Sequence, residues 1–280
     1  MEKKDIERQQ HFIELATAHA EDFKTRVAQH DRENSFPFEN VEALKASGYT
    51  AITVPEELGG GGANVLDLVR AQEQLARGDG PTVVAVNMHL YGTAMFADLW
   101  RLGDESLRPF LESIAREQRL MAAGVSDPRM NSGVGLAGIN DTTRRAEKRD
   151  GGYVINGRAG FGTMSACADF LLGTAHYDDP ERGPLCLTFF VPKDTPGIKI
   201  QTNWDTMSIR SSSSNDIVWE NVFVPEENIM PRLARTWDTF DSLFAAWLPS
   251  LDAPYVGLAQ AARDYAVSYT HLTLPTILRV

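Results

Sequence analysis

Hydrophobic positions recur at helical spacing through the first part of the chain. Over residues 4–30 the apolar side chains follow one another at steps of three, four and seven, which predicts one amphipathic helix. The side chains on this stripe are Ile6, Ile13, Ala16, Ala20, Phe23 and Val27. A second helix is expected over residues 38–47, because Pro37 can begin a helix and Gly48 can end one.

The next polar and glycine positions predict two further helices. Residues 55–62 end in four consecutive glycines and are expected to form a loop. Asn64 can accept a hydrogen bond from the first turn of a helix, so we expect it to cap one that reaches Ala76. Pro81 is expected to begin the following helix, which is apolar nearly all round, as the central helix of a bundle is. With one more short helix, residues 1–120 are expected to form an all-α domain.

The period changes at Met121, where short β-rich runs begin. Each run is bounded by Gly, Pro, Asn or Asp, which is typical of strands in a small antiparallel domain. The runs cover residues 154–155, 170–174, 185–191, 198–200 and 217–224. Asn156-Gly157 predicts a hairpin turn, because both central positions of a type I′ turn need positive φ. We therefore expect a middle antiparallel β domain, like a barrel or a sandwich, over residues 121–231.

Helical spacing returns after Pro231, where Pro249 and Pro254 are expected to kink or split the helix. Residues 232–267 would be the first part of a C-terminal helical domain, which makes the chain an α+β multidomain protein. The expected apolar face consists of Phe240, Phe244, Trp247, Leu251, Tyr255 and Leu258. Residues 268–280 are Thr-rich and β-prone, and we expect them to be a non-native tail, with a short genuine terminus as the alternative.

Composition narrows the class of protein. The net charge is −11, so neither a nucleic acid nor an anionic membrane surface is an expected partner. The first residues are charged and no apolar run is long enough to span a bilayer, so neither a secretory signal nor a membrane span is expected. The two cysteines and six histidines have neither disulfide nor metal-ligand spacing. These features favour a cytoplasmic protein without a metal.

Three stretches in order carry a resemblance to a known family. The first is Gly48-Tyr49 with residues 54–60; the second is residues 124–128 with Asn131-Ser132-Gly133 and residues 151–163; the third is residues 210–214 with 218–225. Together they resemble the acyl-CoA dehydrogenase family, over nearly the whole chain as far as Val267. The resemblance implies an α-bundle, a β domain, a second α-bundle and bound FAD.

The resemblance also implies the cofactor-binding residues. The family's Thr-Glu-Pro-x-x-Gly-Ser stretch lies over the flavin. Here Ser126-Asp127-Pro128 takes its first place and Ser132 its second, with Val125 beside them. The family's Trp-Ile-Thr stretch corresponds to Phe161-Gly162-Thr163. A flavin needs an apolar slab and a few fixed polar contacts, which these residue types can provide. The alternative is a core aromatic residue with ordinary turn hydroxyls.

Two further residues are candidate substrate contacts. Arg210 begins a stretch that resembles the family's Arg-x-Ser-x-Thr, with Ser214 in place of the threonine. In the family this arginine lies near the dinucleotide or the contact between domains, and a surface ion pair is the alternative. His89 lies in the helix that lines the acyl pocket of relatives, and a packing histidine is the alternative.

The resemblance implies α,β-dehydrogenation of an acyl-CoA thioester in fatty acid metabolism. An electron-transfer flavoprotein would accept the electrons, and the intact protein would be a homo-oligomer. The reaction needs a carboxylate as general base. Trp247 occupies the family's early site for that glutamate, and the late site lies past Val280. We therefore expect a truncated chain that is inactive alone. The alternatives are a flavin-dependent monooxygenase of the same fold and a non-catalytic fragment.

Overall fold

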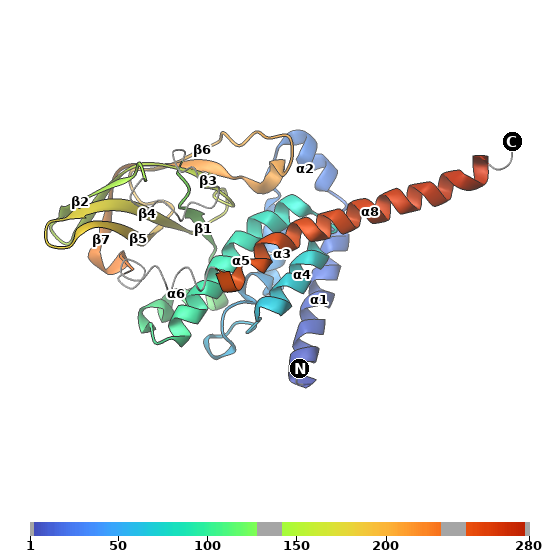
Figure 1. Ribbon diagram of the computed structural model, residues 1–280, viewed down its shortest axis with the longest axis horizontal. Coiled ribbons are helices and arrows are strands. Elements are labelled where there is room, and N and C mark those ends of the chain that lie inside the picture. Colours follow the sequence, from blue (N-terminus) through green and yellow to red (C-terminus); the bar gives the residue numbers. More distant parts are fainter. Residues whose placement is uncertain (1–2, 128–141, 231–244, 278–280) are drawn as a thin grey trace.

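The chain folds into a helical domain that lies beside a curled sheet. The computed structural model describes residues 3–127, 142–230 and 245–277, with side chains as far as residue 270. The last helix crosses the helical domain, and its C-terminal half extends away from the rest of the molecule (Figure 1). This arrangement confirms the predicted order of helices, strands and further helix.

Six helices make up the N-terminal domain. Asn64 caps the fourth helix, as predicted: it accepts a hydrogen bond from Asp67 N at 3.0 Å, and Asp67 Oδ2 accepts one from Asn64 N at 3.1 Å. Pro81 lies in the first turn of the fifth helix, which Asp79 caps. The helices are α1 (Lys3–Phe23), α2 (Val27–Glu33), α3 (Phe38–Ala46), α4 (Val65–Leu75), α5 (Gly80–Arg101) and α6 (Arg108–Glu117), with 3-10 turns η1 (Tyr49–Ala51), η2 (Glu56–Leu58) and η3 (Glu105–Leu107) between them.

The single helix expected over residues 4–30 is in fact two helices. The chain turns between Phe23 and Val27, and α2 leaves in a new direction. At this turn Arg26 donates from Nε to Asn40 Oδ1 on α3, at 2.5 Å, and pairs with Asp22 one turn earlier. Because of this break, the Arg26 guanidinium links α1 to α3. The spacing of apolar residues along the sequence gives no indication of such a long-range contact.

Seven strands form a mixed sheet. They are β1 (Met121–Gly124), β2 (Arg145–Arg149), β3 (Gly152–Gly162), β4 (Phe170–Asp179), β5 (Gly183–Pro192), β6 (Ile198–Gln201) and β7 (Asn215–Pro225). The order is β1-β4-β2-β3-β7-β6, and β5 also pairs with β4. Most pairs are antiparallel, but β1 runs parallel to β4, and β2 meets β4 in parallel at Arg145 and His176. The sheet is therefore mixed, whereas a wholly antiparallel sheet was expected. Parallel strands need crossover connections, and the chain makes such connections to place β4 beside β1 and β2.

The hairpin predicted at Asn156-Gly157 is wrong. Strand β3 continues through this dipeptide with a bulge, and the turn lies at residues 150–151, between β2 and β3. Glycine is needed at 157 for another reason. Its φ is +137°, and a Cβ there would come within 2.7 Å of Arg144 Cα. The glycine thus marks a close approach of two backbones instead of a turn.

Aromatic rings join the two domains. Phe110 of α6 stacks on Phe190 of β5 with ring centroids 4.5 Å apart, and Phe96 of α5 meets the same ring edge-on at 5.1 Å. Phe110 also contacts Phe170 of β4 at 5.8 Å. Burial of several rings in one cluster stabilises this boundary, so the helices hold the β4–β5 end of the sheet in a fixed place.

Helix α8 (Pro249–Ile277) is separated from the helical residues 245–247 by a turn at Leu248, so the predicted split occurs at Pro249 but not at Pro254. Pro249 begins it, and Pro254, which has no N–H, leaves the carbonyl of Ser250 without its usual helical partner. Asn87 Nδ2 donates to that carbonyl at 2.9 Å and so replaces the missing bond. The helix then continues through the Thr-rich segment, because extending a formed helix needs no new nucleus.

The predicted apolar face of this region is only partly correct. Phe240 and Phe244 lie outside the described residues. Trp247 is buried, but the Tyr255 side chain is 54% exposed. Gly257 faces α4, where a Cβ would approach the backbone oxygen of Glu73 to 2.2 Å. Close contact through a small residue therefore sets the direction of α8.

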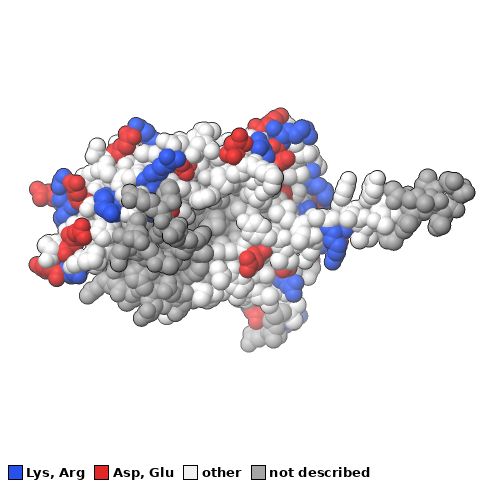
Figure 2. Space-filling model, turned by 45° about the horizontal axis from the view of Figure 1, so that its top comes forward, with Lys and Arg blue, Asp and Glu red and all other residues white. Residues whose placement is uncertain are grey.

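Charged side chains of both signs are mixed over the face seen in Figure 2. Exposed ion pairs include Lys148 with Glu226 at 2.9 Å and Lys199 with Glu220 at 2.6 Å. Such exposed pairs contribute little to stability. Within residues 3–127, 142–230 and 245–277, no helix combines the length and apolar character needed to cross a bilayer.

Candidate cofactor site

An exposed aromatic ring marks the end of β3. The side chain of Phe161 is 63% exposed, and its backbone has φ of +55°, which a bulky residue rarely adopts. Its ring meets Trp204 edge-on, with centroids 5.8 Å apart. Trp204 in turn donates from Nε1 to Ile209 O at 3.0 Å, which fixes the indole. The sheet therefore presents an apolar surface on a strained backbone, as binding sites often do.

A cluster of hydroxyl groups forms around Thr163, two residues after Phe161. Thr163 Oγ1 lies 3.0 Å from Ser214 Oγ, which lies 2.8 Å from Ser212 Oγ. Ser212 O accepts a hydrogen bond from Met164 N at 3.1 Å. The structure thus brings the Phe161-Gly162-Thr163 stretch together with the four serines at residues 211–214, about fifty residues later in the sequence.

The segment after β1 completes this side of the sheet. Ser126 O accepts a hydrogen bond from Gly160 N at 3.1 Å, so Val125 and Ser126 lie beside the residue that precedes Phe161. Asp127 is buried, and its Oδ2 accepts hydrogen bonds from Thr143 Oγ1 at 2.7 Å and Thr142 Oγ1 at 3.1 Å. Its carboxylate therefore anchors the segment.

The described residues include all but one of the five predicted cofactor contacts. Four of them, Val125, Ser126, Phe161 and Thr163, lie on two adjacent segments of the sheet. The fifth, Ser132, lies outside the described residues.

Arg144 is a residue of this region that the sequence did not indicate. It is fully buried, and its guanidinium donates to backbone carbonyls on three neighbouring segments. Burial lowers its pKa to about 10, although Asp127 opposes the shift. The group therefore stays charged at neutral pH. An arginine just before a strand forms no distinctive sequence pattern. Gly157 could have pointed to a close neighbour such as Arg144, if this glycine had been interpreted as a close approach of two backbones instead of as a turn.

The two candidate substrate contacts have protein partners. Arg210 donates to the Asp31 carbonyl of α2 at 2.9 Å and pairs with Asp205 at 3.0 Å, so it joins the two domains. His89 is buried: its Nε2 donates to Thr50 O at 2.9 Å, and its Nδ1 accepts from Met121 N at 3.1 Å. Burial lowers the pKa of His89 to about 4, so its imidazole is neutral near pH 7. This geometry favours a packing role for His89.

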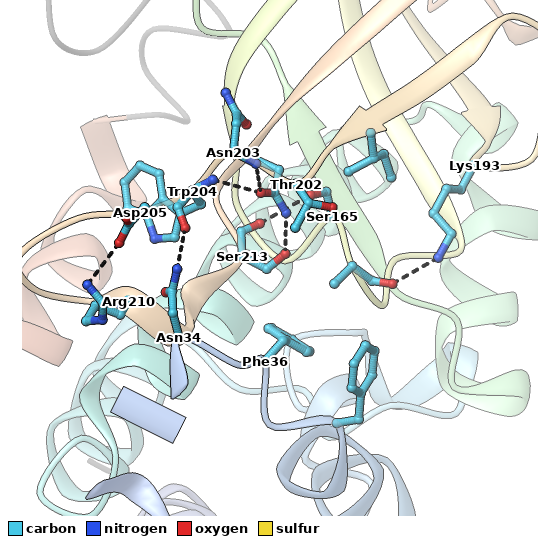
Figure 3. A pocket seen from close by; sticks show the side chains of 14 residues that line it. Asn34, Phe36, Ser165, Lys193, Thr202, Asn203, Trp204, Asp205, Arg210 and Ser213 are labelled. Carbon is cyan, nitrogen blue, oxygen red and sulfur yellow. Dashed lines mark hydrogen bonds and ion pairs between the residues drawn. The ribbon is translucent and has the colours of Figure 1, made fainter. Parts of the chain in front are cut away.

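A cavity of about 510 Å³ lies between the helical domain and the sheet (Figure 3). Phe36 lies on its helical side, while Ser165, Thr202 and Ser213 lie on its sheet side. Trp204 lines the cavity and also contacts Phe161. Trp204 is thus shared by the cavity and by the aromatic surface, and the cavity could hold part of a ligand.

Trp247 occupies a separate place in the helical domain. Its side chain is buried, and Nε1 donates to Asp98 Oδ2 at 2.7 Å. Asp98 also pairs with Arg101 at 2.9 Å. A second cavity of about 450 Å³ adjoins these side chains. Residue 247 has no carboxylate, and its only polar group, the indole N–H, is already bound to Asp98.

Comparison with known proteins identifies similar sequences over most of the chain. Residues 6–118 match the N-terminal domain of acyl-CoA dehydrogenases, and residues 122–222 match their middle domain. The chain is 32% identical to "Putative acyl-CoA dehydrogenase YdbM" of Bacillus subtilis (strain 168), over 97% of this chain and 69% of that protein. It is 28% identical to "Amino sugar nitrososynthase DnmZ" of Streptomyces peucetius, over 85% of this chain and 58% of that protein.

A solved structure has the same fold. It is that of KijD3 in complex with FMN and dTDP-3-amino-2,3,6-trideoxy-4-keto-3-methyl-D-glucose. The TM-score is 0.80 at 28% identity, over 93% of this chain and 63% of that chain. The chain thus spans 58–69% of the length of these relatives.

Proposed function

The chain belongs to the acyl-CoA dehydrogenase family, a family of flavoenzymes, and we propose that its Phe161 surface binds the isoalloxazine ring of FAD. The observation that carries this proposal is the exposed ring on a left-handed backbone. The positive φ costs free energy, and the contact with Trp204 leaves most of the residue exposed. A planar ligand stacked on the ring would account for both.

The described residues around Phe161 fit a flavin. The phenyl ring offers an apolar face, and the half-buried Thr163, two residues further along the chain, offers a hydroxyl group that Ser214 holds in place. Backbone groups of Val125 and Ser126 lie on the neighbouring segment. These are the two kinds of contact that hold a flavin and adjust its electronic properties. A contact from Ser132 and the preference for FAD over FMN stay predictions.

The proposed reaction is α,β-dehydrogenation of an acyl-CoA thioester. Bound flavin would supply the hydride acceptor in that chemistry. The residues of this chain would bind and orient the ring, and the cavity beside Trp204 would have room for a further part of the ligand. Trp247 has no carboxylate, so the general base must be another residue.

Further parts of the proposal concern the surroundings of the enzyme. We expect a cytoplasmic homo-oligomer that takes part in fatty acid metabolism. Its electrons would pass to an electron-transfer flavoprotein.

A flavin-dependent monooxygenase is the second candidate. Two observations favour it: the similarity to an amino sugar nitrososynthase, and the indole of Trp247 at the early position of the base. A monooxygenase uses oxygen and reduced flavin and needs no base at an acyl α-carbon. Reduction of bound flavin by acyl-CoA without oxygen would support the dehydrogenase. Oxygen consumption that needs a separate flavin reductase would support the monooxygenase.

The test of cofactor binding is a titration of the purified chain with FAD and with FMN, followed by flavin fluorescence. We expect saturable binding, and Phe161→Ala should weaken it about tenfold, or about 1.4 kcal/mol. Phe223→Ala is the matched control, because Phe223 is also an exposed phenylalanine of the sheet but lies on β7, away from the site. A chain that binds neither flavin would instead be a non-catalytic module.

A further inference from the structure

Arg144 is the most buried cation among the described residues of the β domain. Its side chain has no exposed surface, and its guanidinium is surrounded by hydrogen-bond acceptors. Nη2 donates to Val125 O at 2.8 Å and to Thr174 Oγ1 at 2.8 Å. Nη1 donates to Ser126 O at 3.1 Å and to Arg158 O at 3.2 Å, while Nε donates to Thr174 O. All three nitrogens of the guanidinium therefore have partners.

These acceptors belong to three different segments of the sheet. Val125 and Ser126 follow β1, Arg158 lies on β3 three residues before Phe161, and Thr174 lies on β4. One side chain thus links both segments that carry the candidate flavin contacts, and it ties them to a third strand. Arg144 is buried and contacts the carbonyl groups of these segments.

A buried charge is an expensive way to hold strands together. Removing a guanidinium from water costs several kcal/mol unless hydrogen bonds and a counter-charge compensate. The nearest carboxylate oxygen, Asp127 Oδ2, is 4.0 Å away and also accepts hydrogen bonds from two threonines. Apolar side chains of the same volume would pack the sheet at lower cost. Apolar side chains, however, would not fix the directions of the four carbonyl groups that Arg144 binds.

The neighbouring backbone is adapted to this side chain. Gly157 has φ of +137°, and any Cβ there would lie 2.7 Å from Arg144 Cα and 2.9 Å from its Cγ. The bulge in β3 at this position moves the strand so that Arg158 O reaches the guanidinium. Two departures from regular strand geometry, a bulge and a left-handed glycine, thus accommodate one arginine.

We propose that Arg144 is a positioning residue of the cofactor site, whose guanidinium holds the Val125–Ser126 segment against β3 in the arrangement that flavin binding requires. The inference rests on the proposed flavin site and adds a residue that determines its geometry. Arg144 acts through the backbone and need not touch the ligand.

The test separates cofactor affinity from stability. In Arg144→Lys, a single ammonium group replaces the planar guanidinium group. The positive charge is kept, but most of the hydrogen bonds to the carbonyl groups are lost. We expect FAD affinity to fall at least tenfold, with faster hydrogen exchange of residues 121–127 in the flavin-free chain. Trp219→Leu is the matched control: Trp219 is equally buried in this sheet and packs on Phe189. It should lower the melting temperature at least as much, with FAD affinity within twofold of wild type.

A second variant keeps the test decisive if the lysine variant folds poorly. Arg144→Ala leaves a space for free guanidinium, which at non-denaturing concentration should restore FAD affinity and the visible flavin spectrum, while methylammonium should not. Equal affinity in wild type and all Arg144 variants would overturn the inference alone. Equal loss of affinity in Trp219→Leu would overturn it too. A wild-type chain that binds no flavin would overturn the proposed function, and this inference with it.

Discussion

The helical domain and the β domain use their buried polar groups differently. In the helical domain such groups bond to one another in a chain. Tyr49 Oη donates to Gln72 Oε1, and Gln72 Nε2 donates to Asn87 Oδ1, each at 2.9 Å. Asn87 then donates to the Ser250 carbonyl of α8. Every member is buried, so this chain of bonds serves only to hold four segments together.

In the β domain the buried polar groups surround a surface that is left exposed. Arg144 bonds backbone carbonyls, and Ser212 and Ser214 bond toward Thr163, while the ring of Phe161 faces solvent. The polar network of the helical domain is thus wholly internal, whereas the sheet ends in a surface whose features suit a ligand. Changes in the first region should alter stability alone. Changes in the second should alter flavin affinity more than stability.

The largest expected effect comes from breaking the polar chain of the helical domain. Asn87→Leu removes a donor and an acceptor, and it leaves the Gln72 Nε2 group and the Ser250 carbonyl buried without those partners. The free energy of unfolding should fall by about 4 kcal/mol, since each buried unsatisfied group costs 1–3 kcal/mol. Thermal unfolding measures this loss. FAD affinity at a temperature where the variant is folded should stay unchanged, and a tenfold loss there would contradict the division between the regions.

Acid should act on the helical domain through His89. Burial lowers its folded pKa from 6.5 to about 4, so the unfolded chain binds the proton more readily. The resulting stability is fully present above pH 6.5 and is lost as the pH falls toward 4, by about 3 kcal/mol at 1.36 kcal/mol per pKa unit. In His89→Gln, whose amide can both donate and accept, unfolding followed between pH 7 and 4 should show a flatter dependence. An equal fall in both proteins would rule out His89 as the cause.

A smaller effect is expected at the bulge of the β domain. Gly157→Ala places a methyl group against the Arg144 backbone and imposes positive φ on alanine. The free energy of unfolding should fall by about 2 kcal/mol, in the range of strained backbone positions. FAD affinity should fall as well, because the guanidinium would move away from its carbonyls. Gly183→Ala, at an open turn with positive φ, is the control, and it should lower stability slightly without changing the affinity.

The smallest change in stability is expected at the exposed ring. Phe161→Asn replaces a bulky residue at φ of +55° with one that tolerates this conformation, so stability should rise by about 0.5 kcal/mol. The same substitution removes the apolar face and should weaken FAD binding about tenfold, or about 1.4 kcal/mol. Parallel melting and titration experiments would show the opposite signs. A loss of stability would mean that Phe161 belongs to the core.

Local signals predicted much of the helical domain. The cap at Asn64, the first turn at Pro81 and the apolar α5 all depend on residues a few positions apart, which periodicity can report. The break after Phe23 was missed because it depends on Arg26 reaching another helix. Sequence spacing describes how a helix forms but not which distant group interrupts it.

Long-range contacts explain why less of the β domain could be predicted. Asn156-Gly157 has the composition of a hairpin turn, yet its glycine serves the close approach of Arg144. The resemblance to a family indicated Phe161 and Thr163, while no local pattern showed that Ser214 would lie beside them. Arg144 was missed because its role depends on carbonyls brought together by pairing of strands.

Hydrogen exchange with and without FAD tests the central claim most directly, because it compares the two regions in one experiment. The account predicts slower exchange on adding FAD for residues 121–127, 158–165 and 211–215, with little change in α4 and α5. Protection confined to α4 and α5, or no protection anywhere under saturating FAD, would contradict a flavin site on the β domain.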